Sequence, residues 1–227
     1  MRGRSTGGRD DAGVLDLDRE RLTVLDTDPI VGSALAALRD ERTVPADFRA
    51  QAHRLGALLA TRAVADLPAS SSSVRTPLAD AATRVPAVPV VAVPVLRAGL
   101  GLLPGVHQVL PEAQVGMIGL ERDHVSLAAR RYYFKVPPLT GAWVLVLEPM
   151  LATGGSASDA VQALDAEGAA RIVVLSVVAT EQGVARVLDA DPRVRVVTAA
   201  VDPGLDERGY IVPGLGDFGD RLFGTPH

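Results

Sequence analysis

Apolar residues recur at two different spacings along the chain, and this difference separates an N-terminal part from a C-terminal part. In residues 29–67 they recur three and four positions apart, for example at Ile30, Ala34 and Leu38, which is the period of an amphipathic helix. This part is also rich in alanine and arginine, which favour helices. We therefore expect mostly helix here, followed by a polar break at residues 70–73.

From residue 88 onward the apolar positions come in short, continuous, valine-rich runs. Such runs are typical of strands that are buried on both faces of a parallel sheet. Predicted helices at residues 156–166 and 182–190 alternate with them, as in βαβ units, while residues 120–141 are expected to form a loop or hairpin. The predicted strands are residues 88–96, 143–147, 172–178 and 194–201.

Composition narrows the class of protein without identifying it. The 227 residues are enough for one domain with a real core, and 48% hydrophobic with 22% charged residues is an ordinary globular balance. We expect a flexible tail over residues 1–20 and a single domain over residues 21–227. The net charge of −4 argues against a nucleic-acid partner.

The chain contains no cysteine, so a disulfide, a thiolate zinc site and a cysteine nucleophile are all excluded. This composition fits the cytoplasm, where we expect the protein to act. Its apolar runs are short and interrupted by proline, glycine or charge, and we therefore expect no membrane partner.

Residues 148–156, which we call the phosphate loop, join a predicted strand to a predicted helix. Ligands of open α/β sheets bind at the carboxyl ends of strands, and a helix N-terminus offers backbone N–H groups to an anion. Gly154 and Gly155 allow close backbone approach to a phosphate, and Thr153 and Ser156 add hydroxyl donors. The alternative is a plain turn with Ser156 as the helix N-cap. No lysine follows the glycines, which argues against a nucleotide triphosphatase.

The phosphate loop resembles the loop that binds phosphoribosyl diphosphate (PRPP) in uracil phosphoribosyltransferases. That loop usually reads Asp-Pro-Met-Leu-Ala-Thr-Gly-Gly-Ser, and here only its first residue differs. A carboxylate at this first position can accept hydrogen bonds from sugar hydroxyls. The residues implied to bind PRPP are Glu148, Pro149, Met150, Leu151, Ala152, Thr153, Gly154, Gly155 and Ser156.

Two arginines lie in further segments that resemble this family. Arg97 directly follows the predicted strand 88–96, where a guanidinium can pair with a phosphate through two parallel hydrogen bonds. Without the resemblance it would pass for an ordinary surface arginine. Residues 95–101 resemble the family's Pro-Ile-Leu-Arg-Ala-Gly-Leu segment, whose arginine contacts the diphosphate. Residues 119–123 resemble the segment before the family's mobile loop, which implies that Arg122 binds PRPP as well.

Residues 206–225, which we call the acceptor segment, are rich in glycine and proline. Backbone N–H and C=O groups exposed by such a loop suit a flat base, and Tyr210 or Ile211 can pack on its ring. The segment resembles the uracil-binding C-terminus of the same family, which also implies a contact of Asp217 to PRPP. The predicted base-binding residues are Tyr210, Ile211, Gly216, Asp217 and Phe218.

The resemblance implies a type I phosphoribosyltransferase fold of the α/β class. This fold has a mostly parallel central sheet flanked by helices, an N-terminal helical segment and a C-terminal hood over the base. The implied reaction transfers the 5-phosphoribosyl group from PRPP to uracil and gives UMP and diphosphate. Arg97 and Asp217 are the implied catalytic residues. The implied cofactor is Mg²⁺ carried by PRPP without direct protein ligands, and the implied assembly is a homodimer or a larger homo-oligomer.

The chain departs from the family pattern at several places, and these departures leave two alternatives open. Glu148 replaces an aspartate, Phe218 adds a phenyl ring where the family has a small alanine beside the base, and residues 180–183 replace an Ala-Pro-Glu-Gly turn. Residues 61–62 and 124–138 also differ. One alternative is transfer to a different base or planar acceptor. The other is a homologue that senses PRPP or a nucleotide with little or no catalysis.

Overall fold

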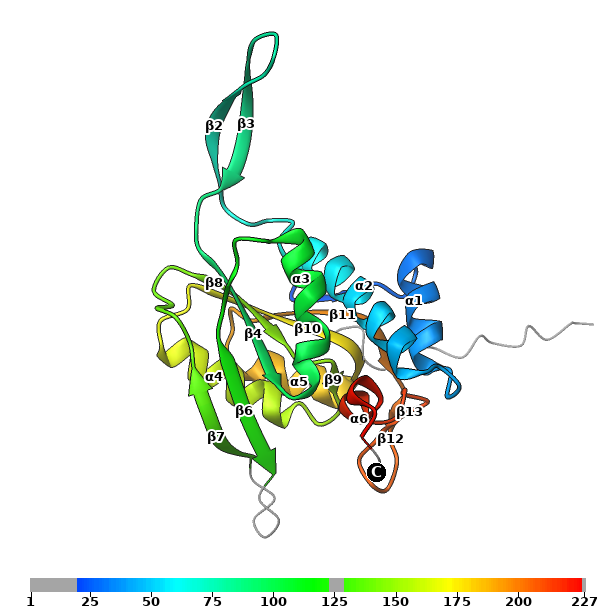
Figure 1. Cartoon of the computed structure of the whole chain (residues 1–227). Coiled ribbons are helices and arrows are strands. Elements are labelled where there is room, and N and C mark those ends of the chain that lie inside the picture. The colour runs from blue at the N-terminus through cyan, green and yellow to red at the C-terminus, as the bar shows by residue number, and fades with distance from the viewer. Residues whose placement is uncertain (1–19, 123–128, 226–227) are drawn as a thin grey trace, which may run out of the picture.

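The computed structural model describes residues 20–122 and 129–225. A mainly parallel sheet lies between two layers of helices (Figure 1), with strands in the order β1-β11-β10-β8-β4-β6-β7. Short strands β5 and β9 pair with β4 and β10. The strands are β1 (Leu22–Val24), β4 (Val90–Leu96), β5 (Gln114–Val115), β6 (Met117–Arg122), β7 (Ala129–Lys135), β8 (Trp143–Leu147), β9 (Met150–Leu151), β10 (Arg171–Thr180) and β11 (Arg195–Asp202).

The valine-rich runs form the centre of this sheet, which confirms the strands predicted from them. β4, β8, β10 and β11 lie parallel to their neighbours. β8 is buried at every position and β10 at every position but its first, because helices cover both faces. β7 runs antiparallel to β6, which confirms the hairpin alternative for the described residues 120–122 and 129–135. The carboxyl ends of the parallel strands therefore lie along one edge of the sheet.

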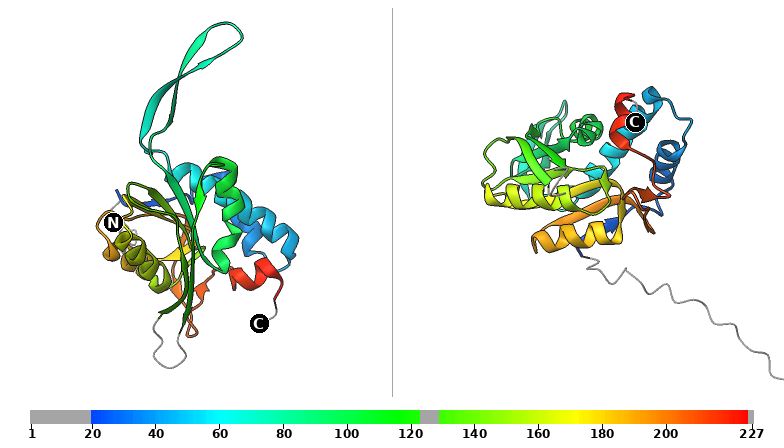
Figure 2. Two further views of the ribbon diagram at one scale, coloured as in Figure 1. Left: turned by 60° about the vertical axis from the view of Figure 1, so that its left-hand side comes forward. Right: turned by 90° about the horizontal axis from the view of Figure 1, so that it is seen from below.

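Helices flank the two faces as two separate groups (Figure 2). Both N-terminal helices begin at a proline, which suits the first helical turn, and Asp28 caps α1 through a 2.8 Å bond from the Ile30 N–H. One face carries α1 (Pro29–Arg39), α2 (Pro45–Ala63), the 3₁₀ turn η1 (Ala98–Gly101), α3 (Leu103–Val109) and α6 (Phe218–Phe223); the other carries α4 (Gly155–Ala166) and α5 (Glu181–Ala190).

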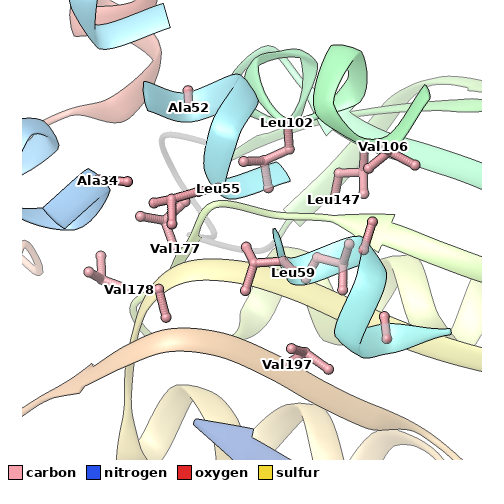
Figure 3. Close-up of a cluster of buried hydrophobic side chains, with 14 of the residues drawn as sticks. Ala34, Ala52, Leu55, Leu59, Leu102, Val106, Leu147, Val177, Val178 and Val197 are labelled. Carbon is pink, nitrogen blue, oxygen red and sulfur yellow. The ribbon is translucent and has the colours of Figure 1, made fainter. Parts of the chain in front are cut away.

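Alternate side chains of each strand feed two apolar layers, one on each side of the sheet. Leu147, Val177 and Val197 face α2, where Leu55 and Leu59 meet them (Figure 3). On the opposite face a second cluster, which includes valines of β4, β8, β10 and β11, packs against α4 and α5. With both faces covered, the sheet is a rigid base for the loops at its carboxyl edge.

A two-stranded hairpin projects from this body (Figure 1 and Figure 2). It consists of β2 (Ala69–Arg75) and β3 (Asp80–Pro86), so the predicted polar break at residues 70–73 is wrong. The serines of β2 are exposed and carry no apolar alternation, and only pairing with β3 makes them a strand. Leu78 at the tip is 92% exposed.

β12 (Gly204–Leu205) directly precedes the acceptor segment and pairs antiparallel with β13 (Ile211–Val212) inside it, and the segment also contains α6. Among the helices of the described residues, none has the length and apolar character needed to cross a bilayer.

Candidate active site

The loops after β4 and β8 meet at the carboxyl edge of the sheet. The two strands pair in parallel up to Pro94 and Leu147, so Arg97 and Glu148 follow neighbouring strand ends. The contact is close: a Cβ added to Gly99 would lie 2.2 Å from the carbonyl oxygen of Leu147. Only glycine fits there, and this explains why Gly99 follows Arg97 and Ala98 in the loop.

Arg122 ends β6, which pairs in parallel with β4. Its backbone therefore lies at the same edge of the sheet as Arg97, one strand further on. The Arg122 side chain lies outside the described part of the structure, and its predicted contact with PRPP stays a prediction.

The phosphate loop follows β8 and leads directly into α4. Its Met150–Leu151 part forms β9 against β10, and the helix begins at Gly155. Gly154 takes the N-cap position in the left-handed region, with φ of 70°, and among the described residues no side chain caps the helix. The prediction that Ser156 is the N-cap in the alternative is therefore wrong, while phosphate binding by the loop stays a prediction. The N–H groups of the first turn remain available to an anion, and the helix dipole favours one.

The N-terminus of α5 supports the phosphate loop from behind. A Cβ on Gly183 would lie 2.2 Å from the Leu151 carbonyl oxygen, and one on Gly154 would lie 2.4 Å from the Gly183 carbonyl oxygen. Thr180 adds a hydrogen bond from its hydroxyl to the carbonyl of Ala152, at 2.6 Å. Sequence reasoning missed this support because Thr180 and Gly183 look like an ordinary start of a helix.

Glu148 is half-buried at the first position of the phosphate loop. Burial raises the pKa of its carboxyl to about 8, and a hydrogen bond from the Met150 backbone offsets only part of that effect. At neutral pH the ligand-free carboxyl is therefore mostly protonated. In that form it can donate to a hydroxyl as well as accept from one.

A network of ionic hydrogen bonds holds the acceptor segment in place. Arg39 of α1 donates to both carboxylate oxygens of Asp202, at 2.8 and 2.6 Å, and to the Gly214 carbonyl at 2.8 Å. Asp202 in turn accepts from the Gly214 N–H at 2.9 Å. Arg221 of α6 donates to the carbonyls of Leu215, at 2.7 Å, and of Asp40, at 2.6 Å. These bonds fix the turn just before Gly216.

Within the predicted base site, Asp217 and Gly216 occupy the turn into α6. The Asp217 carboxylate caps this short helix by accepting from the Asp220 N–H at 2.8 Å. Gly216 is exposed with φ of 80°, a left-handed conformation that favours glycine. Tyr210 is 43% exposed, whereas Ile211 is buried in the apolar layer next to α2.

Phe218 corrects one expectation drawn from the sequence. Its side chain is 1% exposed and packs edge-to-face on Phe48 of α2, with 5.1 Å between ring centroids. Gly101 makes room for it, since a Cβ there would lie 2.8 Å from the ring. The phenyl ring therefore belongs to the core, and the expectation that it adds bulk beside the base is wrong.

Arg97 connects the two parts of the site. Its Nη2 lies 3.3 Å from Oδ1 of Asp220 in α6, and its guanidinium lies over the ring of Phe223 at 5.4 Å from the centroid. The peptide bond between Leu96 and Arg97 is cis. Gly99 of the same loop lies against the Leu147 carbonyl at the end of β8. Residues 97–101, which we call the arginine loop, therefore touch both the strand before the phosphate loop and the end of the acceptor segment.

In residues 20–122 and 129–225 no three acidic or histidine side chains gather closely enough to hold a metal ion. Mg²⁺ is commonly bound through substrate phosphates with few protein ligands, so the expected Mg²⁺ carried by PRPP is compatible with these residues and stays a prediction.

The fold and this carboxyl edge together define the class of type I phosphoribosyltransferases. Three features lie at one edge of the mainly parallel sheet. They are the N-terminus of α4, which no described side chain caps, the guanidinium of Arg97, and the polar acceptor segment. Such a site suits a phosphorylated sugar beside a flat acceptor.

Comparison with known proteins narrows this class to one family. The family model of uracil phosphoribosyltransferase matches residues 24–225. A uracil phosphoribosyltransferase of Thermus thermophilus is 44% identical over 207 residues, covering 90% of this chain and 99% of that protein. One of Corynebacterium glutamicum is 45% identical over 198 residues, covering 86% and 93%. A solved structure of an Aquifex aeolicus protein, 32% identical, has a TM-score of 0.85 and covers 90% of this chain and 98% of that one. The chain belongs to the uracil phosphoribosyltransferase family.

Proposed function

We propose that the protein transfers the 5-phosphoribosyl group from PRPP to uracil and releases UMP and diphosphate. The observation that carries the proposal is the position of the arginine loop, which adjoins the end of β8 through Gly99 and contacts α6 through Asp220. A donor held by the phosphate loop and an acceptor held at residues 216–218 would then meet beside Arg97.

In the proposed mechanism each part of the edge holds one part of the reactants. The N-terminus of α4 binds the 5′-phosphate, and the protonated or ionised Glu148 carboxyl bonds to a ribose hydroxyl. Arg97 and Arg122 neutralise the leaving diphosphate as the C1′–O bond breaks and positive charge develops on the ribose. Backbone groups of residues 216–218 align the base with C1′, and Asp217 orients PRPP or the base.

We propose that PRPP is used as its Mg²⁺ complex, in which the cation would offset the negative charge of the diphosphate while Arg97 and Arg122 would contact that diphosphate from the protein. A divalent cation that is already bound by phosphate oxygens needs few protein ligands. The expected observation is activity that follows the concentration of the Mg²⁺–PRPP complex and disappears with excess chelator.

Uracil is favoured over another planar acceptor because the main structural reason to expect a different one has been removed. The phenyl ring of Phe218 lies in the core against Phe48 and takes no space beside the base. The remaining departures that bear on the acceptor are Glu148 and the segment 124–138, of which residues 124–128 lie outside the described residues.

The test is incubation of the protein with PRPP, Mg²⁺ and a panel of bases and aromatic acids, with products identified by mass spectrometry. We expect UMP from uracil, and a kcat/KM for uracil above that of every other acceptor. A different preferred acceptor would replace uracil in the proposal. PRPP binding without any product from the whole panel would favour a sensing role.

We also propose a homo-oligomer, which the projecting hairpin supports. A two-stranded hairpin is marginal in water on its own, and this one carries exposed Val74, Leu78 and Val85. A second copy that covers these side chains would stabilise it. Light scattering should therefore give a dimer or larger species, and replacing residues 70–85 with a short glycine-rich turn should shift it toward the monomer. An unchanged mass would contradict the role of the hairpin.

A further inference from the structure

One hydroxyl group joins the phosphate loop to the helix behind it. Thr180 is the last residue of β10 and the N-cap of α5, and it is 1% exposed. Its Oγ1 accepts from the Gly183 N–H at 3.1 Å and donates to the Ala152 carbonyl oxygen at 2.6 Å. The first bond caps a helix, but the second reaches 28 residues back along the chain into the phosphate loop.

The bond to Ala152 fixes the orientation of a peptide group in that loop. In a planar trans peptide the C=O of one residue and the N–H of the next point in opposite directions. A hydrogen bond that draws the Ala152 carbonyl toward α5 therefore turns the Thr153 N–H away from α5. One residue further on, Gly154 has the left-handed conformation from which α4 starts.

Contacts around this bond leave the loop little room for another arrangement. Gly183 lies against the carbonyls of Leu151 and Ala152, where a Cβ would be 2.2 and 2.7 Å from their oxygens. β9 pairs with β10 at Met150 and Leu151 only, and this pairing ends before Ala152. At Ala152 the hydrogen bond from the Thr180 hydroxyl then connects the phosphate loop to the end of β10. The corresponding turn of the family, Ala-Pro-Glu-Gly, has no hydroxyl at this position.

We propose that Thr180 is a positioning residue for the donor: through the Ala152 carbonyl it holds the phosphate loop in the form that receives the phosphoribosyl group. This rests on the proposed use of the loop for PRPP. Thr180 itself touches no substrate, and its effect falls on the donor rather than on the acceptor.

The substitution Thr180→Val tests this, because it keeps the branched shape and removes only the hydroxyl. We expect the KM for PRPP to rise by about tenfold, the size of one hydrogen-bond contribution. The KM for uracil should change by less than about twofold, since the acceptor segment is held by other bonds. Thr180→Ser keeps a hydroxyl and should restore the wild-type KM for PRPP. An equal rise in both KM values, or no rescue by serine, would overturn the proposal.

Thr198→Val is the matched control. Thr198 is fully buried in β11, and its hydroxyl donates to the Ala200 carbonyl at 3.0 Å. This variant loses a comparable bond in a strand that does not touch the phosphate loop, so we expect reduced stability with unchanged KM for PRPP. A similar rise in that KM would show that any buried hydroxyl has this effect, and would contradict a specific role for Thr180.

Binding of ribose 5-phosphate, measured by calorimetry on wild type, Thr180→Val and Thr180→Ser, separates this proposal from the proposed function. It requires no turnover and no acceptor. Weaker binding by Thr180→Val alone would support the positioning role even if uracil is not the substrate. Equal binding by all three proteins would overturn that role even if UMP is formed. Thr180→Ala serves in place of Thr180→Val if the valine variant does not fold.

Discussion

Arg97 and Asp220, which lie 123 residues apart in the chain, form an ion pair with 3.3 Å between Nη2 and Oδ1. The pair joins the loop after β4 to α6, and so links the two parts of the edge that are proposed to hold the donor and the acceptor. The Arg97 side chain is 57% exposed, so this pair contributes little to stability. Its consequence is orientation: Asp220 and the Phe223 ring hold the guanidinium beside α6, and we propose that it meets the diphosphate there.

Replacing Arg97 should affect catalysis far more than folding. We expect Arg97→Ala to lower kcat/KM for PRPP by about 100-fold or more, because a preorganised cation is lost where negative charge develops on the leaving group. Arg97→Lys keeps the positive charge but loses the planar guanidinium with its two parallel donors. Its kcat/KM for PRPP should lie between those of the wild type and Arg97→Ala. The free energy of unfolding in urea should change by less than about 1 kcal/mol. Loss of stability in parallel with loss of activity would contradict this account.

Phe218→Ala should destabilise the fold. The ring is 1% exposed against Phe48, and deleting such a ring costs about 3–5 kcal/mol through lost burial and the cavity that remains. Urea unfolding followed by tryptophan fluorescence measures this change. Phe223→Ala, at a position that is 43% exposed, is the control and should cost about 1 kcal/mol or less. A Phe218→Ala protein of wild-type stability with altered affinity for uracil would place the ring beside the base after all.

Asp202→Ala should destabilise the protein and weaken binding of the acceptor. It leaves the partly buried Arg39 guanidinium and the Gly214 N–H without their carboxylate, at a cost of about 3–5 kcal/mol. The KM for uracil should rise because the turn before Gly216 loses its support. Arg42→Ala breaks the exposed pair with Asp40 and should leave stability nearly unchanged, which makes it the control. Equal effects of the two substitutions would contradict the role of Asp202.

Glu148 should make stability depend on pH in the ligand-free protein. Its pKa is raised from an ordinary 4.5 to about 8, so the folded state holds a proton that the unfolded state has released. Its contribution to stability is then complete below pH 4.5 and is lost as pH rises through 8. Glu148→Gln has no such proton. As pH rises from 4.5 to 8, the wild type should therefore lose unfolding free energy relative to Glu148→Gln. A difference that stays constant with pH would contradict the raised pKa.

Local sequence was enough to determine the central strands and the helices α1, α2, α4 and α5, but not α3 or α6. The continuous apolar run of β8 and the three- and four-residue spacing in α1 are local signals, and burial on both faces or on one face follows from them. The order Gly154-Gly155 after a strand likewise predicted a helix start with close backbone approach. Similarity to a family, also carried by the sequence, supplied the identity of the donor and the acceptor.

Contacts between distant segments were decided only by the tertiary structure. Residues 70–73 became a strand because β3 pairs with them, and Phe218 entered the core because Gly101 and Phe48 provide a space that no local pattern shows. The Thr180 hydroxyl reaches Ala152 because β9 and β10 lie side by side. Periodicity records which face of an element is buried, but the identity of the group that meets a side chain depends on how the chain packs.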